Sequence, residues 1–143
     1  MPELNSNEIQ QIIPHRYPFL LVDRITDYEA GKWAKGIKCV CAGGMFFMGH
    51  FPEQHVMPGV LILEALAQVG AVALLSMPEY AGKIALFGGV KNARFKAQVR
   101  PGDVLEMETE LTTLRGPMGI GSAIARVNGK TAAKAELIFA IQD

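Results

Sequence analysis

The sequence has few cysteines, no excess of either charge and no stretch that resembles a secretory signal. Its 143 residues include two cysteines, and 14 basic residues balance 14 acidic ones. A chain without net charge has no general electrostatic attraction to nucleic acid or to an anionic membrane, so neither is an expected partner. The N-terminal residues lack a basic region followed by an apolar stretch, so we expect no export and a cytoplasmic location.

The two cysteines, Cys39 and Cys41, are separated by one residue. This spacing is poor for a disulfide, and two thiol ligands are too few for a zinc site. We therefore expect reduced, buried thiols and no metal or other cofactor. The chain length fits one compact domain spanning residues 1–143, which is long enough to bury a core without disulfides or metal.

Alternating apolar residues and turn signals predict a chain with six strands and two helices. Residues 8–13 form a short helix, begun by a capping box of Asn5 and Glu8. Strands are predicted at residues 19–29, 33–42, 83–99, 104–115, 122–127 and 130–142, with the first two paired as a hairpin. Glutamates at positions 106, 108 and 110 indicate a sheet with one wet face. The Asn128-Gly129 pair predicts a hairpin turn.

The second predicted helix, residues 58–76, is apolar on all sides except at Glu64 and Gln68. A membrane span is disfavoured, because the segment carries a carboxylate near its start and has no basic flanks. The alternative is a helix enclosed by protein. We therefore predict an α+β fold in which a bent antiparallel sheet wraps around a long central α-helix.

Glu64 is the acidic residue in this apolar helix, and Gln68 follows one turn later on the same face. Removing an ionised carboxylate from water is costly unless it is paired, and the helix itself offers no basic partner. An unpaired carboxyl would favour its protonated form, which suits a general acid. A structural glutamate bonded to backbone or water is the alternative.

The chain has three histidines that could supply a base for this acid. His50 lies among aromatic residues in MFFMGHFP, which favours the neutral imidazole that can accept a proton. His55 has polar neighbours and is expected to be an ordinary surface histidine. His15, in PHRYPF, is expected to form hydrogen bonds in the N-terminal turn. The residue patterns alone favour His50 only modestly.

The start of the long helix predicts an oxyanion site. Pro58 suits the first helical turn, and the free N–H groups from Gly59 onward point out of the helix N-terminus. Because Gly59 has no side chain, a carbonyl oxygen can approach its amide directly. A base, an acid and an oxyanion donor together suit removal of a proton next to a carbonyl with loss of a nearby hydroxyl. This is the dehydration of a β-hydroxyacyl compound, or its reverse.

Several motifs resemble those of the bacterial (3R)-hydroxyacyl-[acyl-carrier-protein] dehydratases of type II fatty acid synthesis, the FabZ group. They are IPHRYPFLLVDRI, FFMGHFPEQHVMPGVLILEALAQ, ARFKAQVRPGDVL and RGPMGIG, and they span nearly the whole chain. The resemblance implies the hot dog fold and the elimination of water to give trans-2-enoyl-ACP. One departure is that Gly43, Gly44 and Met45 replace the family's frequent Asn-Glu-Pro, which bears on the local loop and the shape of the tunnel.

The resemblance also implies roles for particular residues. His50 removes the C2 proton, Glu64 helps the C3 hydroxyl to leave as water, and the Gly59 amide holds the thioester oxygen. The Val56 carbonyl orients the His50 ring. The implied assembly is a homodimer in which His50 of one subunit faces Glu64 of the other, with dimers further assembled as a trimer of dimers.

Two further surfaces are expected for substrate and partner. The resemblance places the acyl chain in a tunnel between helix and sheet. Candidate lining residues are Phe46, Phe47, Phe87 and Phe95. Acyl carrier protein is acidic, so its docking surface should be basic. The stretch KNARFKAQVR has no acidic residue and contains Lys91, Arg94, Lys96 and Arg100.

Two other functions compete with the dehydratase. A hot dog thioesterase would use Glu64 to activate water or attack the thioester, and it would need no histidine at position 50. A noncatalytic acyl sensor on the same fold is disfavoured, because the chain has no residues to spare for a DNA-binding module.

Overall fold

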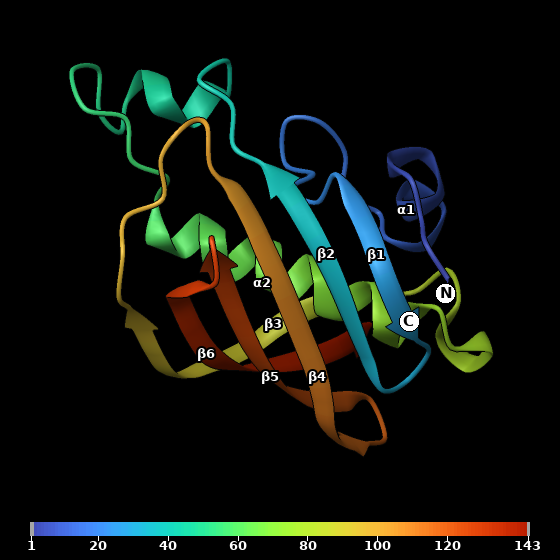
Figure 1. The fold of residues 1–143 in the computed structure, drawn as a ribbon. Helices are drawn as coiled ribbons and strands as arrows, with labels where there is room; N and C mark the ends of the chain where they lie inside the picture. The colour runs from blue at the N-terminus through green and yellow to red at the C-terminus, as the bar shows by residue number, and fades with distance from the viewer. Residues whose placement is uncertain (1, 143) are drawn as a thin grey trace.

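The computed structural model describes residues 2–142 as one curved antiparallel sheet with a long helix on its inner side (Figure 1). The elements in chain order are α1 (Ser6–Ile12), β1 (Arg24–Glu29), β2 (Trp33–Cys39), the 3-10 helix η1 (Met45–Met48), α2 (Gly59–Leu75), the 3-10 helix η2 (Pro78–Tyr80), β3 (Ile84–Phe95), β4 (Val104–Arg115), β5 (Met118–Val127) and β6 (Lys130–Gln142). The six strands lie in the order β1-β2-β4-β5-β6-β3, and every neighbouring pair is antiparallel.

Helix α2 is enclosed by the sheet, and it contacts all six strands. Its apolar residues lie all around its axis, so a sheet that covers several sides of the helix buries them best. Helix and sheet are close together at Gly70, where an added Cβ would lie 2.7 Å from Thr109 Cγ2 and 2.9 Å from Phe139 Cζ. The predicted α+β hot dog architecture is confirmed. Among the described residues, no helix is long and apolar enough to cross a membrane.

The predicted β1-β2 hairpin is confirmed, but the first strand begins five residues later than expected, at Arg24. The reason is a side chain of α2. Gln68 Nε2 donates to Phe19 O at 2.8 Å, and Leu21 N donates to Gln68 Oε1 at 2.8 Å. These backbone groups are therefore bonded to the helix, and residues 19–23 run across α2 before the chain enters the sheet.

Other element boundaries differ by a few residues from the predicted ones. The first helix covers Ser6–Ile12 and has the expected capping box of Asn5 and Glu8. Strand β3 ends at Phe95, and β5 begins at Met118, which extends the predicted strand toward the preceding turn. The expected hairpin turn is confirmed, since Asn128 and the following glycine have φ values of 51° and 79°.

The alternation in β4 is as predicted, whereas the placement of the cysteines is not. Leu105, Met107 and Thr109 are buried, and the glutamates between them are exposed or half-buried. In β2 the buried positions are occupied by Ala34 and Gly36, so Cys39 falls on the outer face. Cys39 and Cys41 are both exposed, and the expectation of buried thiols is wrong.

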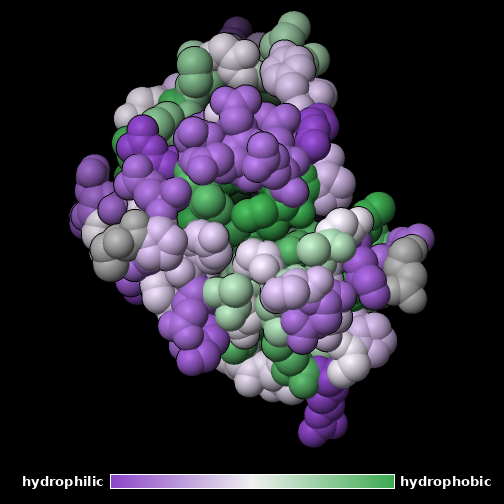
Figure 2. Space-filling model, turned by 90° about the vertical axis from the view of Figure 1, so that its right-hand side faces the viewer, coloured by the Kyte–Doolittle hydropathy of each residue, from purple (hydrophilic) through white to green (hydrophobic). Residues whose placement is uncertain are grey.

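Strand β3 lies at the edge of the sheet and leaves large apolar side chains uncovered. The exposed ones include Leu86, Phe87, Val90 and Phe95. Hydrophobic surface also gathers elsewhere. Figure 2 views the molecule from the side on which α1 lies in Figure 1, and it shows a hollow of hydrophobic surface beneath a hydrophilic rim. An edge strand with exposed apolar side chains is a surface suited to pairing with another chain.

Candidate active site

The N-terminus of α2 opens onto a cavity of about 470 Å³. Pro58 is the N-cap residue and provides no side-chain cap, and the Gly59 amide has no acceptor among the described residues. The ring of Phe95 lies against Gly59, where an added Cβ would approach Phe95 Cε1 to 2.7 Å. The cavity lining is Val56, Met57, Gly59, Val60, Ile62, Phe95, Lys96, Ala97 and Gln98. A free amide at a helix start can donate to an oxygen that carries negative charge.

His50 is half-buried in the loop that leads to α2, and one ring nitrogen is engaged. Its Nδ1 lies 2.8 Å from Val56 O, and its ring stacks on Phe51 with centroids 4.1 Å apart. A carbonyl oxygen can only accept, so the proton of the neutral ring is on Nδ1 and Nε2 carries the lone pair. The backbone of Val56 thus holds His50 in the tautomer that can act as a base through Nε2.

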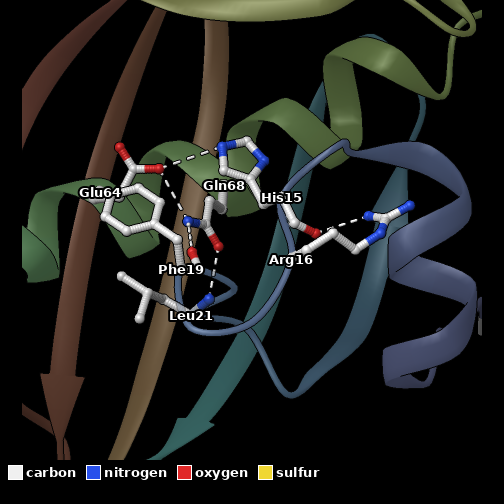
Figure 3. A network of polar contacts seen from close by, with 6 residues as sticks. All are labelled: His15, Arg16, Phe19, Leu21, Glu64 and Gln68. Carbon is white, nitrogen blue, oxygen red and sulfur yellow. Dashed lines mark hydrogen bonds and ion pairs between the residues drawn. The ribbon is translucent and has the colours of Figure 1, made fainter. Parts of the chain in front are cut away.

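Glu64 lies further along α2 and lines a second cavity, of about 230 Å³. Its side chain is 16% exposed, and one carboxylate oxygen makes both of its polar contacts among the described residues (Figure 3). Gln68 Nε2 donates to Glu64 Oε2 at 2.9 Å, and His15 Nε2 lies 3.4 Å from the same oxygen. The expectation of an unpaired carboxyl is therefore wrong, because the N-terminal segment brings His15 over the helix.

The amide of Gln68 has only one orientation that satisfies its surroundings. Its Oε1 accepts from Leu21 N, so its Nε2 must face Phe19 O and Glu64. If the amide were turned over, Gln68 Oε1 would face the oxygens of Phe19 and Glu64, and Gln68 Nε2 would face the N–H of Leu21. Gln68 is consequently a fixed donor to Glu64, as its position one turn later on the helix suggested.

One chain does not bring His50 and Glu64 to the same cavity. Val56, which holds His50, lines the cavity at the helix start together with Gly59. Glu64 lines the other cavity, with lining residues His15, Phe19, Glu64, Ala67, Gln68, Ala71, Ala85, Leu86, Phe87 and Phe139. His50 itself lines neither of these two cavities, and within one chain the Gly59 amide and the Glu64 carboxyl lie at different cavities.

The four phenylalanines predicted to line the tunnel occupy different environments. Phe87 lines the cavity of Glu64, and Phe95 lines the cavity of Gly59. Phe47 is 1% exposed and belongs to the core, and Phe46 packs against it with ring centroids 4.5 Å apart. His55 is half-buried with its ring 5.4 Å from that of Phe47, so it is not the exposed surface histidine that its polar neighbours suggested.

The basic residues of the predicted docking surface are exposed on β3 and on the chain that follows it. They are Lys91, Arg94, Lys96 and Arg100. Lys96 also lines the cavity of Gly59, so positive charge borders the opening at the start of α2. No group of three or more potential metal ligands occurs among the described residues.

Sequence reasoning missed the contact between His15 and Glu64. The two residues are far apart in sequence, and the contact depends on the path of residues 13–21 across α2. The motif PHRYPF singled out His15, but no spacing rule connects it with a helix that begins more than forty residues later.

Comparison of the sequence with known proteins identifies its family. The family described as the FabA-like domain matches residues 13–136. A curated relative from Clostridium botulinum (strain Kyoto / Type A2), named 3-hydroxyacyl-[acyl-carrier-protein] dehydratase FabZ, is 62% identical over 138 residues, which are 96% of each chain. A relative of the same name from Bacillus thuringiensis (strain Al Hakam) is 60% identical over 140 residues, covering 98% of this chain and 97% of the relative.

Solved structures agree on the fold. The dehydratase heterocomplex ApeI:P from Xenorhabdus doucetiae superimposes with a TM-score of 0.80, covering 94% of this chain and 91% of that chain at 16% identity. The uncharacterised protein PH1136 from Pyrococcus horikoshii gives a TM-score of 0.72 at 12% identity, covering 100% of this chain and 96% of that chain. At these identities the likeness concerns the fold alone.

Proposed function

This chain belongs to the FabA-like domain family, and from that premise we propose that it removes water from (3R)-3-hydroxyacyl chains carried by acyl carrier protein, giving trans-2-enoyl-ACP. It is a hydro-lyase of fatty acid biosynthesis. The observation that carries the residue assignment is the 2.8 Å contact between His50 Nδ1 and Val56 O. Because a carbonyl can only accept, this contact favours the tautomer that leaves Nε2 as a base.

The elimination uses three groups of the protein. His50 Nε2 takes the proton from C2, and the electrons of the broken C–H bond form the C2–C3 double bond. The C3–O bond breaks as Glu64 transfers its proton to the departing hydroxyl, which leaves as water. Negative charge that develops on the thioester oxygen is stabilised by the Gly59 amide, which has no acceptor within the described chain.

We propose that the complete site forms between two chains of a homodimer. The separation of His50 from the cavity of Glu64 supports this arrangement, because a second chain can supply the group that the first lacks. The exposed apolar side chains of the edge strand β3 provide a surface for the pairing. The further assembly into a trimer of dimers, which the resemblance implies, is part of the same proposal.

The function is tested with purified protein and a 3-hydroxyacyl carrier protein. The wild type should form the trans-2-enoyl product, and His50→Ala and Glu64→Gln should each lower kcat by about 10²-fold or more. Release of free acid is measured in the same reactions. A thioesterase would release acid and would tolerate His50→Ala, so that result would overturn the dehydratase assignment.

We propose that the basic residues of β3 and the following segment receive the acidic carrier protein. The double variant Lys91→Glu/Arg94→Glu, which spares the cavity-lining Lys96, should raise KM for carrier-linked substrate and leave turnover of a short thioester mimic nearly unchanged. The matched control is Arg115→Glu, which reverses an exposed charge at the far end of β4. Equal losses on both substrates would contradict docking at this surface.

A cytoplasmic location and a single domain of residues 1–143 complete the proposal. Two free, exposed cysteines suit a reducing compartment, where thiols are not oxidised to disulfides. Cell fractionation with a thiol-alkylation assay would check the location.

A further inference from the structure

The carboxyl group of Glu64 is asymmetric in its contacts, and this asymmetry bears on where its proton resides. Oε2 faces two nitrogen atoms, Gln68 Nε2 at 2.9 Å and His15 Nε2 at 3.4 Å. Oε1 has no hydrogen-bond partner among the described residues, and Figure 3 shows it pointing away from both donors. A proton on Oε2 would face the fixed N–H of Gln68, whereas a proton on Oε1 is free to reach substrate.

Only one tautomer of the neutral His15 ring fits these contacts. Its Nδ1 is the one buried side-chain nitrogen or oxygen in the described part of the chain that has no hydrogen-bond partner. A proton on Nδ1 would be buried without an acceptor, which is unfavourable, whereas a lone pair there costs less. The neutral ring with its proton on Nε2 therefore fits both sides, because the lone pair is left on the buried Nδ1 and Nε2 lies 3.4 Å from Glu64 Oε2.

The backbone of His15 is held in place by its neighbour Arg16. The Arg16 guanidinium donates from Nη1 to Ile13 O at 3.0 Å and to His15 O at 2.7 Å, and from Nη2 to Gln10 O at 2.9 Å. Arg16 thus links the C-terminal part of α1 and its C-cap residue to the backbone of His15. The ring itself stacks against Phe19, with centroids 6.5 Å apart and an interplanar angle of 16°.

We propose that His15 is a positioning residue for Glu64: the amide of Gln68 donates to Oε2, and His15 Nε2 lies 3.4 Å from the same oxygen, which together confine the transferable proton to Oε1. The inference rests on the proposed role of Glu64 as general acid. As Oε1 gives up its proton, negative charge develops on the carboxyl, and hydrogen bonds to a carboxylate are stronger than those to the neutral acid. The contact from His15, which is long in the free protein, then shortens and stabilises the transition state.

The kinetic test compares two replacements of His15. His15→Phe keeps a ring that can stack on Phe19 but has no donor. His15→Gln places an amide N–H near the position of Nε2. We expect His15→Phe to lower kcat by about tenfold or more with KM within about twofold, and His15→Gln to stay within about threefold of the wild type. A purely structural role reverses this order, because phenylalanine preserves the packing better. Retained kcat in His15→Phe, or equal losses in both variants, would overturn the proposal.

The part played by Arg16 is tested in combination. In Arg16→Lys a single ammonium group replaces the planar guanidinium that donates to three carbonyl oxygens, and it cannot reproduce all three bonds. The variant should therefore lower kcat by a few-fold. If Arg16 acts through His15, this loss disappears when it is measured in the His15→Phe background. Losses that multiply in the double variant would show that Arg16 stabilises the fold independently, and would overturn its link to His15.

A spectroscopic measurement separates this proposal from the proposed function. Long-range ¹H–¹⁵N correlation spectra of the ¹⁵N-labelled protein report which ring nitrogen of His15 carries the proton. We expect the Nε2–H form, with a shift of the Nε2 signal in Glu64→Ala. A proton on Nδ1, or no response to Glu64→Ala, would overturn the proposal whether or not the wild type dehydrates a hydroxyacyl thioester. Absence of dehydratase turnover, with the expected spectrum, would instead refute the proposed function alone.

Discussion

Backbone groups hold two side chains of the proposed site in single orientations. His50 Nδ1 is bonded to Val56 O, and the two ends of the Gln68 amide are bonded to Phe19 O and Leu21 N. Because a carbonyl can only accept and an amide N–H can only donate, these contacts determine which atoms of His50 and Gln68 remain available. The available atoms are a lone pair on His50 Nε2 and an N–H directed at Glu64 Oε2.

The first prediction concerns Gly59, whose missing side chain leaves room for both Phe95 and a substrate oxygen. In Gly59→Ala the new Cβ would lie 2.7 Å from Phe95 Cε1, so the ring or the helix start must move. We expect a loss of about 1–3 kcal/mol in the free energy of unfolding, measured by urea denaturation, and a large loss of kcat.

The double variant Gly59→Ala/Phe95→Leu separates these two effects. The smaller side chain should restore much of the stability, because the ring atoms in conflict are gone. Activity should stay low, since the Cβ still obstructs the approach of the thioester oxygen to the amide. Recovery of activity together with stability would mean that the glycine serves only to accommodate Phe95.

Helix α2 and strand β4 approach each other closely enough for a helix carbonyl to bond a strand side chain. Thr109 Oγ1 donates to Leu66 O at 2.8 Å, and both residues are fully buried. This contact is possible because Gly70, one turn later, presents no side chain to the strand. This contact joins β4 to α2 at Leu66, two residues after Glu64 on the helix.

The second prediction is therefore that Gly70→Ala destabilises the protein, although alanine is the better helix former. The gain in helix propensity is about 1 kcal/mol, and overpacking against Thr109 and Phe139 costs about 1–3 kcal/mol. We expect a net loss of about 1 kcal/mol in the free energy of unfolding, measured by chemical denaturation.

Thr109→Ser is the matched companion of Gly70→Ala. It keeps the hydroxyl that donates to Leu66 O and removes the Cγ2 methyl group nearest to the new Cβ. A double-mutant cycle should show positive coupling, with the serine offsetting part of the loss. Strictly additive losses would indicate that crowding against the Thr109 Cγ2 methyl group is not the cause of the destabilisation by Gly70→Ala.

Within one chain, the groups that take part in the proposed reaction lie at two separate places. Val56 and Gly59 line one cavity, Glu64 lines another, and the edge strand β3 carries exposed apolar side chains and residues of both linings. A dimer through this edge would cover the apolar side chains and could bring a base of one chain to the carboxyl of its partner.

The third prediction follows from this division and uses mixed variants. When inactive His50→Ala and Glu64→Ala chains are combined, a heterodimer has one site with both wild-type residues and one with neither. Random exchange in a 1:1 mixture makes about half of the dimers mixed, so about a quarter of the wild-type activity should return. The mixture is compared with each variant alone after denaturation and joint refolding.

A site contained within one chain gives a different result. No chain in the mixture would then hold both His50 and Glu64, and the mixture would be no more active than its components. Size-exclusion chromatography with light scattering on the same samples establishes whether the chains associate at all.

Local patterns in the sequence determined most of the elements and several of the candidate residues. The apolar segment of α2, the alternation of β4 and the Asn128-Gly129 turn depend on residues that are neighbours along the chain. Glu64 and Gly59 stood out for the same reason, as a carboxyl and a helix start within a single motif. The choice of His50 over His55 came from resemblance to a family, because their local surroundings differed only modestly.

Only the tertiary structure decided which groups surround Glu64 and which cavities they line. His15 reaches Glu64, and Gln68 bonds residues 19–21, because the N-terminal segment crosses α2 before it enters the sheet. The outward placement of Cys39 was likewise set by which face of β2 packs on the helix. Periodicity reports the relation of a residue to its own helix or strand. Contacts between distant segments depend on the path of the connecting chain, and no local spacing encodes that path.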